Sequence, residues 1–241
     1  MSAISDTTNT PSPRGAFILF EGIDRCGKTT QVALLDKHLK EVTSGKCQAL
    51  RFPDRTSHIG KLINDYLLST ADSVDVSDQT IHLLFSANRW EAAKGIEKQL
   101  LAGTTLVCDR YAYSGVAFSS AKGVAGMDMD WCRACDKNLP APDCIIYLDM
   151  PVQEAAQRGE FGAERYEKID FQLKVREQFQ KLQDADTAAA AGGSGSGGEG
   201  GVAWHVIDAR GSIEDIHAKI AAIAAATMEK AALRPLGKMF L

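Results

Sequence analysis

The sequence predicts an α/β fold in which a parallel sheet is covered by helices on both faces. Two observations lead to this fold class. From Gly15 onward, short apolar runs have the length and composition of strands, and longer segments with the apolar spacing of amphipathic helices lie between them. Elements that alternate in this way form right-handed crossovers, which place the strands parallel in one doubly wound sheet. Ligands of such sheets bind at the carboxyl ends of the strands.

The individual strands and helices follow from these patterns. The five predicted strands are residues 16–21, 47–52, 104–109, 143–149 and 203–208. The predicted helices are residues 28–43, 59–68, 77–102, 171–185 and 212–230. Ser212, with Asp215 three residues later, has the pattern of a helix N-cap and supports the start of the last helix. We expect one domain over residues 15–241, because the chain is long enough to bury a sizeable single core.

Two segments do not fit this alternation. Residues 1–14, MSAISDTTNTPSPR, are polar and contain proline, and we interpret them as a flexible tail. Residues 188–201, AAAAGGSGSGGEGG, have the composition of a flexible linker. Such a linker can separate two domains, but the single strand and helix that follow it are too little for a second core. We therefore expect a disordered insertion within one domain.

Charge and cysteine content narrow the class of protein. A net charge of −4 argues against a general nucleic-acid binder, because such proteins usually carry a basic excess. The six cysteines have scattered spacings, and no signal peptide or apolar run of membrane-spanning length is evident. We expect a cytoplasmic protein without membrane association, and the nucleus stays open as a second location. Cys132 and Cys135 form a CxxC pair, but no second pair or suitably spaced histidines accompany it, so support for a metal or redox role is weak.

The segment FILFEGIDRCGKTTQ contains a phosphate-binding motif. From Gly22 to Thr29 it matches the P-loop pattern G-x-x-x-x-G-K-[ST], between a predicted strand and a predicted helix. Gly22 and Gly27 allow the backbone to turn so that successive N–H groups face phosphate oxygens, and the helix N-terminus adds positive potential. Lys28 is placed to neutralise the β- and γ-phosphates, and the hydroxyl of Thr29 to bind Mg²⁺. The motif predicts nucleoside-triphosphate binding.

Two classes of P-loop protein remain in competition: a switch or motor NTPase, and a kinase that transfers the γ-phosphoryl group to a small molecule. A GTPase needs an Asn-Lys-x-Asp motif to read guanine, and no Asn-Lys pair occurs in the chain. The DxxG match at residues 208–211 comes too late in the chain, and we interpret it as coincidence. A kinase instead needs arginines for an acceptor phosphate, aromatic residues to stack on a base, and a lid that excludes water.

Three segments supply such residues. The sequence RFPDR, which ends at Arg55, follows the second predicted strand. Phe85 and Arg89 lie one helical turn apart and so share one helix face, although core packing alone could explain Phe85. A buried guanidinium without a partner is costly, so we expect an anionic partner for Arg89. Asp109 and Arg110 end the third predicted strand, where they could hold Mg²⁺ and an acceptor phosphate or could form a structural salt bridge.

The order of these motifs resembles the thymidylate kinase family in its eukaryotic type. The resemblance rests on the P-loop segment and on RFPDR, HLLFSANRWE, DRYAYSGVAFS, LPAPD and RGEFGAERYE, and it covers residues 15–241 apart from the Gly/Ser-rich insertion. It implies the fold of P-loop nucleoside-monophosphate kinases with a lid at about residues 158–167. It further implies transfer of the γ-phosphoryl group of ATP to dTMP in dTTP biosynthesis, with Mg²⁺ and in a homodimer. The family places the dimer interface on helices of the region 77–121.

The resemblance also implies a role for individual residues. It assigns catalysis to Arg25, Lys28, Asp24 and Arg110, with Asp24 as a positioning group, and Mg²⁺ binding to Thr29 and Asp109. It assigns ATP contacts to Gly22, Asp24, Arg25, Cys26, Gly27, Lys28, Thr29, Thr30, Arg158 and Arg210. It assigns dTMP contacts to Asp24, Phe52, Arg55, Phe85, Arg89, Arg110, Gly115, Phe118 and Tyr166. In this comparison Phe85 stacks on thymine, Arg89 reaches its O4, and Arg25 contacts the γ-phosphate.

Two features depart from the family pattern or limit the comparison. Asp54 stands where the family more often has Glu, so the network around Arg55 and the metal could differ. Arg210 follows the last predicted strand close to the insertion, where it could contact adenine or could be a solvated charge. Two alternatives also stay open: another nucleoside or nucleoside-monophosphate kinase, and an NTP-binding protein without transfer activity. A nucleoside kinase should not need so many arginines for an acceptor phosphate. The presence of Arg25, Arg55, Arg89 and Arg110 together also argues against a pure binder, which has no use for an acceptor clamp.

Overall fold

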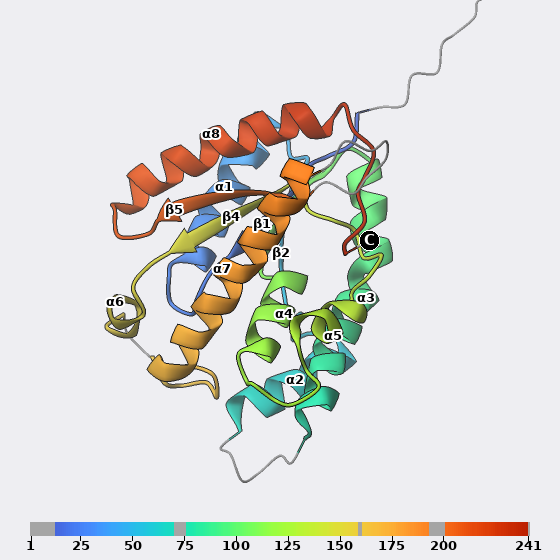
Figure 1. Cartoon of the computed structure of the whole chain (residues 1–241). Helices are drawn as coiled ribbons and strands as arrows, with labels where there is room; N and C mark the ends of the chain where they lie inside the picture. The colour runs from blue at the N-terminus through green and yellow to red at the C-terminus, as the bar shows by residue number, and fades with distance from the viewer. Residues whose placement is uncertain (1–12, 70–75, 159–160, 193–200, 241) are drawn as a thin grey trace, which may run out of the picture.

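The chain folds around one parallel sheet with helices on both faces, as a computed structural model shows (Figure 1). The structure describes residues 13–69, 76–158, 161–192 and 201–240. The strands are β1 (Phe17–Glu21), β2 (Cys47–Arg51), β3 (Thr105–Asp109), β4 (Cys144–Asp149) and β5 (Ala203–Asp208). The spatial order in the sheet is β2-β3-β1-β4-β5, and all neighbours are parallel. The sequence prediction of a five-stranded parallel α/β sheet is confirmed.

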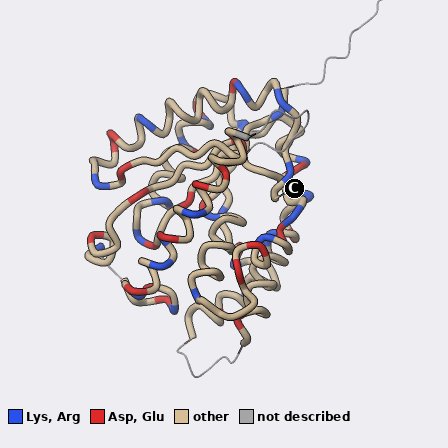
Figure 2. Tube along the Cα trace, viewed as in Figure 1, with Lys and Arg blue, Asp and Glu red and all other residues tan. Residues whose placement is uncertain are grey.

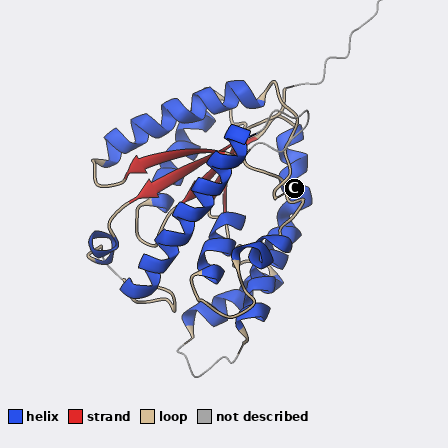
Figure 3. Cartoon of the chain, viewed as in Figure 1, coloured by secondary structure: helices blue, strands red, loops and turns tan. Residues whose placement is uncertain are grey.

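Helices fill the connections between the strands (Figure 3). They are α1 (Lys28–Val42), α2 (His58–Leu68), α3 (Asp78–Leu101), α4 (Ala112–Ser120), α5 (Met129–Ala134), α6 (Val152–Ala156), α7 (Ile169–Gly192) and α8 (Ile213–Ala231). Ser212 caps α8 as predicted, because its hydroxyl accepts the N–H of Asp215 at 3.1 Å. The prediction did not include α4, α5 or α6.

The alternation of side chains along the strands builds two cores, one on each face of the sheet. Phe17 and Leu19 of β1 pack with α3, α4 and α7, whereas Ile18 and Phe20 pack with α1 and α8. Because both faces are covered, the strand is apolar at every one of these positions and fully buried. The two cores fix β1 in the middle of the sheet, and β1 leads directly into the P-loop.

Charges of both signs are spread over the helices, as Figure 2 shows. This distribution agrees with the small net charge of −4. None of the helices in the described part of the chain combines the length and the apolarity that crossing a membrane requires. All six cysteines are free thiols.

The predicted tail and the predicted insertion both need correction at their boundaries. Arg14 is anchored rather than part of a loose tail: its guanidinium pairs with both carboxylate oxygens of Asp143, at 2.6 and 2.9 Å, and its Nε donates to the carbonyl of Arg234. Helix α7 continues to Gly192, because the alanines before it favour helix, so residues 188–192 are not disordered. Residues 1–12 and 193–200, on which the rest of both predictions falls, lie outside the described residues.

We expect Arg14→Ala to destabilise the protein. The pair with Asp143 is largely shielded from water, so the substitution leaves a carboxylate with fewer partners and lowers the free energy of unfolding by about 2 kcal/mol. Urea denaturation at neutral pH measures this loss. Arg210→Ala is the control, because its pair with Asp208 is exposed and should contribute nothing measurable. Equal midpoints for Arg14→Ala and the unsubstituted protein would show that the first described residues do not anchor the sheet.

Candidate active site

The site lies at the carboxyl ends of the central strands. In the sheet register Phe20 of β1 lies beside Asp109 of β3, and Arg51 of β2 lies on the other side of Asp109. The loops that follow β1, β2 and β3 therefore meet at one edge, as is usual for ligand sites in open α/β sheets. The P-loop follows β1 there, and Arg110 follows β3.

The P-loop has the backbone that its glycines predict. Gly22 has a φ angle of 144°, and a side chain there would come within 2.6 Å of the carbonyl oxygen of Leu148. Gly27 has a φ angle of 98° and immediately precedes α1. Lys28 is buried and its ammonium group donates to the carbonyls of Gly22 at 3.2 Å and Ile23 at 2.6 Å. The loop thus holds its cation beside the N-terminus of a helix, an arrangement that suits phosphate.

Thr29 and Asp109 lie together, as predicted. The hydroxyl of Thr29 donates to Oδ2 of Asp109 at 2.8 Å, and Asp109 is buried. Hydroxyl and carboxylate oxygens are the donors that Mg²⁺ takes from proteins when phosphates and water complete its coordination. The described residues contain no group of three or more His, Cys, Asp or Glu that could hold a metal by itself. This pair therefore fits a cation that arrives with a nucleotide.

Arg110 joins the loops after β1 and β3. Its guanidinium donates to the carbonyl of Gly22 and the hydroxyl of Ser114, both at 3.0 Å, and pairs with the carboxylate of Asp24. Its backbone has a φ angle of 66°, which non-glycine residues seldom adopt. The partner of Arg110 among the described residues is thus Asp24 of the P-loop rather than its neighbour Asp109, and the open alternative of a structural salt bridge takes this form.

A buried carboxylate, that of Glu21, stabilises the turn that contains Arg110. Glu21 accepts the backbone N–H groups of Tyr111 and Ser114, both at 3.0 Å, and the hydroxyl of Ser114. Burial raises the pKa of Glu21, although the charge of Arg110 and these hydrogen bonds oppose the rise. Glu21 thereby ties the end of β1 to the start of α4 and fixes the backbone from which Arg110 projects.

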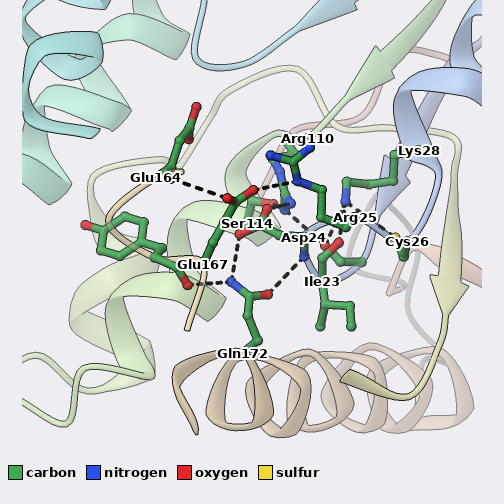
Figure 4. A network of polar contacts seen from close by, with 12 residues as sticks. Ile23, Asp24, Arg25, Cys26, Lys28, Arg110, Ser114, Glu164, Glu167 and Gln172 are labelled. Atoms are coloured by element: carbon green, nitrogen blue, oxygen red, sulfur yellow. Dashed lines mark hydrogen bonds and ion pairs between the residues drawn. The ribbon is translucent and has the colours of Figure 1, made fainter. Parts of the chain in front are cut away.

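Gln172 of α7 holds Asp24 from the other side, as Figure 4 shows. Its Oε1 accepts the backbone N–H of Asp24 at 2.9 Å, and its Nε2 donates to Oδ2 of Asp24 at 2.7 Å. The same Nε2 donates to the carbonyl of Tyr166 at 3.0 Å. Gln172 is fully buried, so these three bonds define its orientation and connect the P-loop to the segment before α7.

That segment contains the described part of the predicted lid. Glu167 pairs with Arg25 at 2.7 Å, and its second carboxylate oxygen accepts the N–H groups of Gly162, Ala163 and Glu164. Burial acts to raise the pKa of Glu167, but the bonds from Arg25 and the backbone outweigh it, so the pKa lies below its usual value. Glu167 thus folds the segment into a loop over the P-loop. Residues 159 and 160 lie outside the described residues.

Aromatic and apolar residues surround one cavity beside Arg110, which we call the aromatic cavity. The predicted residues that line it are Asp24, Phe52, Arg55, Phe85, Arg89, Arg110, Gly115, Phe118 and Tyr166. The guanidinium of Arg110 lies 5.0 Å from the centre of the Phe118 ring, and the Tyr166 and Phe118 rings are 5.8 Å apart. Phe85 and Arg89 both line this cavity, which confirms that they share one helix face.

Arg89 has the anionic partner that its burial requires. Its Nε and Nη2 donate to the two carboxylate oxygens of Asp136, at 3.0 and 2.6 Å. Arg55, which is more exposed, pairs with Glu164 at 2.7 Å. Asp54 turns its carboxylate to Thr56 and does not line this cavity, so the departure from Glu leaves the pair of Arg55 with Glu164 in place.

A second cavity, the P-loop cavity, adjoins the first. The predicted residues that line it are Asp24, Arg25, Gly27, Lys28, Thr29, Thr30, Asp109, Arg110 and Arg158. Arg158 donates to the carbonyls of Ala209 and, more weakly, Arg25. Asp24, Arg51, Arg110 and Glu164 line both cavities. A ligand in one cavity would therefore meet a ligand in the other at this cluster of charges.

The structure brings together almost all the residues that the sequence predicted. Gly22 and Cys26 belong to the loop without lining its cavity, and Gly22 acts through its carbonyl. Arg210 is the exception, because its exposed guanidinium pairs with Asp208 and lines neither cavity.

Several residues of the site were missed by the sequence analysis. They include Glu21, Arg51, Ser114, Asp136, Glu164, Glu167 and Gln172. Arg51, Glu164 and Glu167 lie inside segments that had been singled out, RFPDR and RGEFGAERYE. A search for one acidic partner for each arginine of the predicted site could therefore have found the two glutamates. Asp136 and Gln172 carry no signal of their own, because an Asp after a short helix and a Gln in a long one are ordinary surface residues.

Comparison with known proteins identifies what this arrangement resembles. A sequence model of the thymidylate kinase family matches residues 20–220. A thymidylate kinase of Schizosaccharomyces pombe is 46% identical over 86% of this chain and 90% of its own, and one of Dictyostelium discoideum is 44% identical over 94% and 92%. The human thymidylate kinase is 40% identical over 94% of this chain and 98% of its own. A solved thymidylate kinase structure from Candida albicans has a TM-score of 0.78 at 32% identity and covers 95% of this chain and 99% of its own.

We expect Glu167→Gln to loosen the loop before α7. An amide accepts the three backbone N–H groups less strongly than a carboxylate and loses the ion pair with Arg25. Hydrogen–deuterium exchange, corrected for intrinsic rates, should show at least tenfold faster exchange at residues 162–164. Glu177→Gln, an exposed position on α7, is the matched control.

The same contacts make the loop sensitive to acid. The folded pKa of Glu167 lies below its ordinary value of 4.5, so its contribution is complete above that pH and is lost as the pH falls through the folded pKa. Protection of residues 162–164 should therefore disappear in acid before global unfolding. Protection that persists in Glu167→Gln would contradict this role.

Proposed function

This chain belongs to the thymidylate kinase family, and we propose that its two adjoining cavities hold ATP and dTMP in line for phosphoryl transfer. It is an ATP-dependent nucleoside monophosphate kinase that transfers the γ-phosphoryl group of ATP to dTMP, giving dTDP and ADP for dTTP biosynthesis. The observation that carries the proposed arrangement is the set of charged residues that line both cavities, because a group transferred between two nucleotides must pass where their sites meet.

The P-loop cavity would hold the phosphates of ATP. The backbone of residues 22–27 and the ammonium of Lys28 would bind the β- and γ-phosphates, with Cys26 and Thr30 as flanking contacts. Arg25 would contact the γ-phosphate, and Arg158, which lies over the P-loop, would border adenine. Arg210 stays a prediction for the adenine end of the site, and its pair with Asp208 would have to open for it.

Thr29 and Asp109 would hold Mg²⁺ together with the phosphates. Their two oxygens fit a cation that keeps most of its coordination for phosphate and water. When bound, Mg²⁺ supplies positive charge against the phosphate oxygens. No other described residues provide a competing metal site.

The aromatic cavity would hold dTMP. Phe85 would stack on thymine, Arg89 would donate to its O4, and Phe118 would border the deoxyribose. Arg55 and Arg110 would hold the 5′-phosphate, with Phe52, Gly115 and Tyr166 closing the cavity around the nucleotide. A cavity with this mixture of rings and arginines matches a base that carries a phosphate, whereas a nucleoside without phosphate would leave the arginines without an acceptor.

Catalysis then rests on position and charge rather than on proton abstraction. The acceptor phosphate is already ionised at neutral pH, so no strong base is needed, and phosphoryl transfer demands mainly alignment and charge stabilisation. The two carboxylate oxygens of Asp24 already accept from Arg110 and Gln172, which suits a positioning role. Lys28, Arg25 and Arg110 would surround the phosphoryl group as it moves.

Two further features belong to the proposal. We propose a cytoplasmic enzyme, with the nucleus left open, because six free thiols suit a reducing compartment. We also propose a homodimer through α3. The apolar side chains of Leu83, Trp90 and Leu101 on this helix are 48%, 42% and 57% exposed, and a partner subunit would cover them.

The proposed function is tested by ADP formation with ATP and Mg²⁺ in the presence of different acceptors. We expect turnover to favour dTMP over CMP, AMP and thymidine, and to be close to zero without an acceptor. Turnover independent of any acceptor would contradict the proposal and indicate an NTPase. A preference for thymidine would indicate a nucleoside kinase.

We expect Arg25→Ala to lower kcat by about 10³-fold, in the range of an arginine that stabilises a phosphoryl group in the transition state. The KM for dTMP should change little, because Arg25 does not line the aromatic cavity. Steady-state kinetics separate the two constants. An unchanged kcat would remove Arg25 from the catalytic set.

We expect Gln172→Glu to make activity depend on pH. At neutral pH the new carboxylate would face the carboxylate of Asp24 in place of a donor, and kcat should fall by about 10-fold to 100-fold. Protonation of the new group in acid restores one donor, so activity relative to the unsubstituted enzyme should rise as the pH falls. Gln172→Leu, which cannot titrate, is the control and should be impaired at every pH. Equal pH profiles for the two variants would contradict a direct bond to Asp24.

A further inference from the structure

The buried pair of Arg89 and Asp136 holds the arginine at the base end of the aromatic cavity. Arg89 lies on α3 and Asp136 follows α5, and their side chains are 2% and 0% exposed. Asp136 does not line the cavity, whereas Arg89 does. Asp136 is itself fixed, because the hydroxyl of Ser86 donates to its Oδ1 at 2.8 Å and its N–H donates to the carbonyl of Arg133. The carboxylate is therefore a fixed support behind the arginine.

The hydrogen bonds of Arg89 leave one edge of its guanidinium available. Of its five N–H groups, Nε–H and one N–H of Nη2 donate to Asp136. The structure records no other acceptor for Arg89 among the described residues, so both N–H groups of Nη1 and the second of Nη2 face away from Asp136. Arg89 lines the aromatic cavity, and these are the donors that Asp136 leaves for a ligand there.

Gly115 lies close against the guanidinium of Arg89. A Cβ atom at this position would lie 2.7 Å from Nη2 and 3.1 Å from Nη1 of Arg89. Such distances are below van der Waals contact, so a larger residue would displace the group. The two bonds to Asp136 and the close approach of Gly115 together restrict where the guanidinium can lie.

We propose that Asp136 is a positioning residue that sets base specificity: by holding both Nε and Nη2 of Arg89, it presents a row of fixed N–H donors to the base. A 4-keto pyrimidine offers an oxygen that accepts such donors. Cytosine offers an amino group at the same place, so donor would face donor, and one of the two would lose its bond. This inference rests on the proposed function, since it concerns how the dTMP cavity selects its base.

A purely structural role for Asp136 would not require a buried ion pair with Arg89. A buried ion pair can usually be replaced by apolar residues without loss of stability, so burial alone does not explain why an aspartate and an arginine meet beside a cavity. An ion pair that burial alone does not favour needs another reason to be present, and the donors that Asp136 leaves for a ligand supply one.

The test compares Asp136→Asn with Asp143→Asn. Both substitutions remove one charge from a two-bond Arg–Asp pair, but Asp143 pairs with Arg14 at the opposite ends of the strands. Kinetics with dTMP and dCMP, thermal melting, and the KM for ATP are measured for each. In Asp136→Asn we expect the KM for dTMP to rise by about 10-fold or more and the preference for dTMP over dCMP to fall by a similar factor. We expect kcat and the KM for ATP to stay within about 3-fold, and Asp143→Asn to keep the full preference.

Ser86→Ala keeps the test decisive if Asp136→Asn does not fold. It removes a single bond to Asp136 and leaves the ion pair, so the preference for dTMP should fall by about 3-fold. An unchanged preference in folded Asp136→Asn, or in Ser86→Ala if the first variant does not fold, would overturn the inference. An equal loss in Asp143→Asn would overturn it too. If the unsubstituted enzyme does not use dTMP, the proposed function fails first; if it prefers dTMP and the variants do so equally, only this inference fails.

Discussion

The ion pair between Asp24 and Arg110 is the interaction on which the site depends. Asp24 belongs to the loop after β1 and Arg110 to the turn after β3, and the sheet order places these strands side by side. The pair lies where the P-loop cavity and the aromatic cavity meet. Glu21 supports the turn that carries Arg110, and Gln172 orients Asp24, so both members of the pair are held from outside. Because β1 and β3 are neighbours in the sheet, the loops that follow them bring the two cavities together.

Acidic partners balance the arginines of the site, but they differ in how readily a phosphate can replace them. Arg25 and Arg55 pair with Glu167 and Glu164, which line the P-loop cavity. A phosphate that enters the site competes with these carboxylates for the same guanidinium groups. The pair of Arg55 with Glu164 is about one third exposed on both sides and is therefore the weaker competitor.

Arg89 differs from these arginines because its acidic partner lines neither cavity. Asp136 is fully buried and outside both cavities, so a ligand adds to this pair rather than replacing it. The site thus contains two kinds of arginine. Arg25 and Arg55, the proposed phosphate contacts, have partners that a phosphate could replace, whereas Arg89, the proposed base contact, would keep its partner and its position.

The sequence predicted the sheet well because both of its faces are buried. Buried parallel strands such as β1 are apolar at successive positions, and the P-loop pattern is specific enough to locate the first turn. Helix α4 was missed because it is buried on nearly all sides, so its apolar residues show no helical period, and α5 and α6 are too short to show one. Arg14 was taken as tail because its only signal, the carboxylate of Asp143, is distant in sequence. Gln172 and Asp136 were missed for the same reason, since their roles arise only from contacts that the fold creates.

The central claim is that two nucleotide sites meet at the pair of Asp24 and Arg110. It is tested most directly with a ligand in which adenosine and thymidine are joined 5′ to 5′ through a chain of phosphates, measured in competition with ATP and, separately, with dTMP. The account predicts one molecule bound per chain, which excludes both substrates, because the chain of phosphates would run past Lys28 and Arg110 from one cavity to the other. Competition with ATP alone, with dTMP still able to bind, would contradict a continuous site.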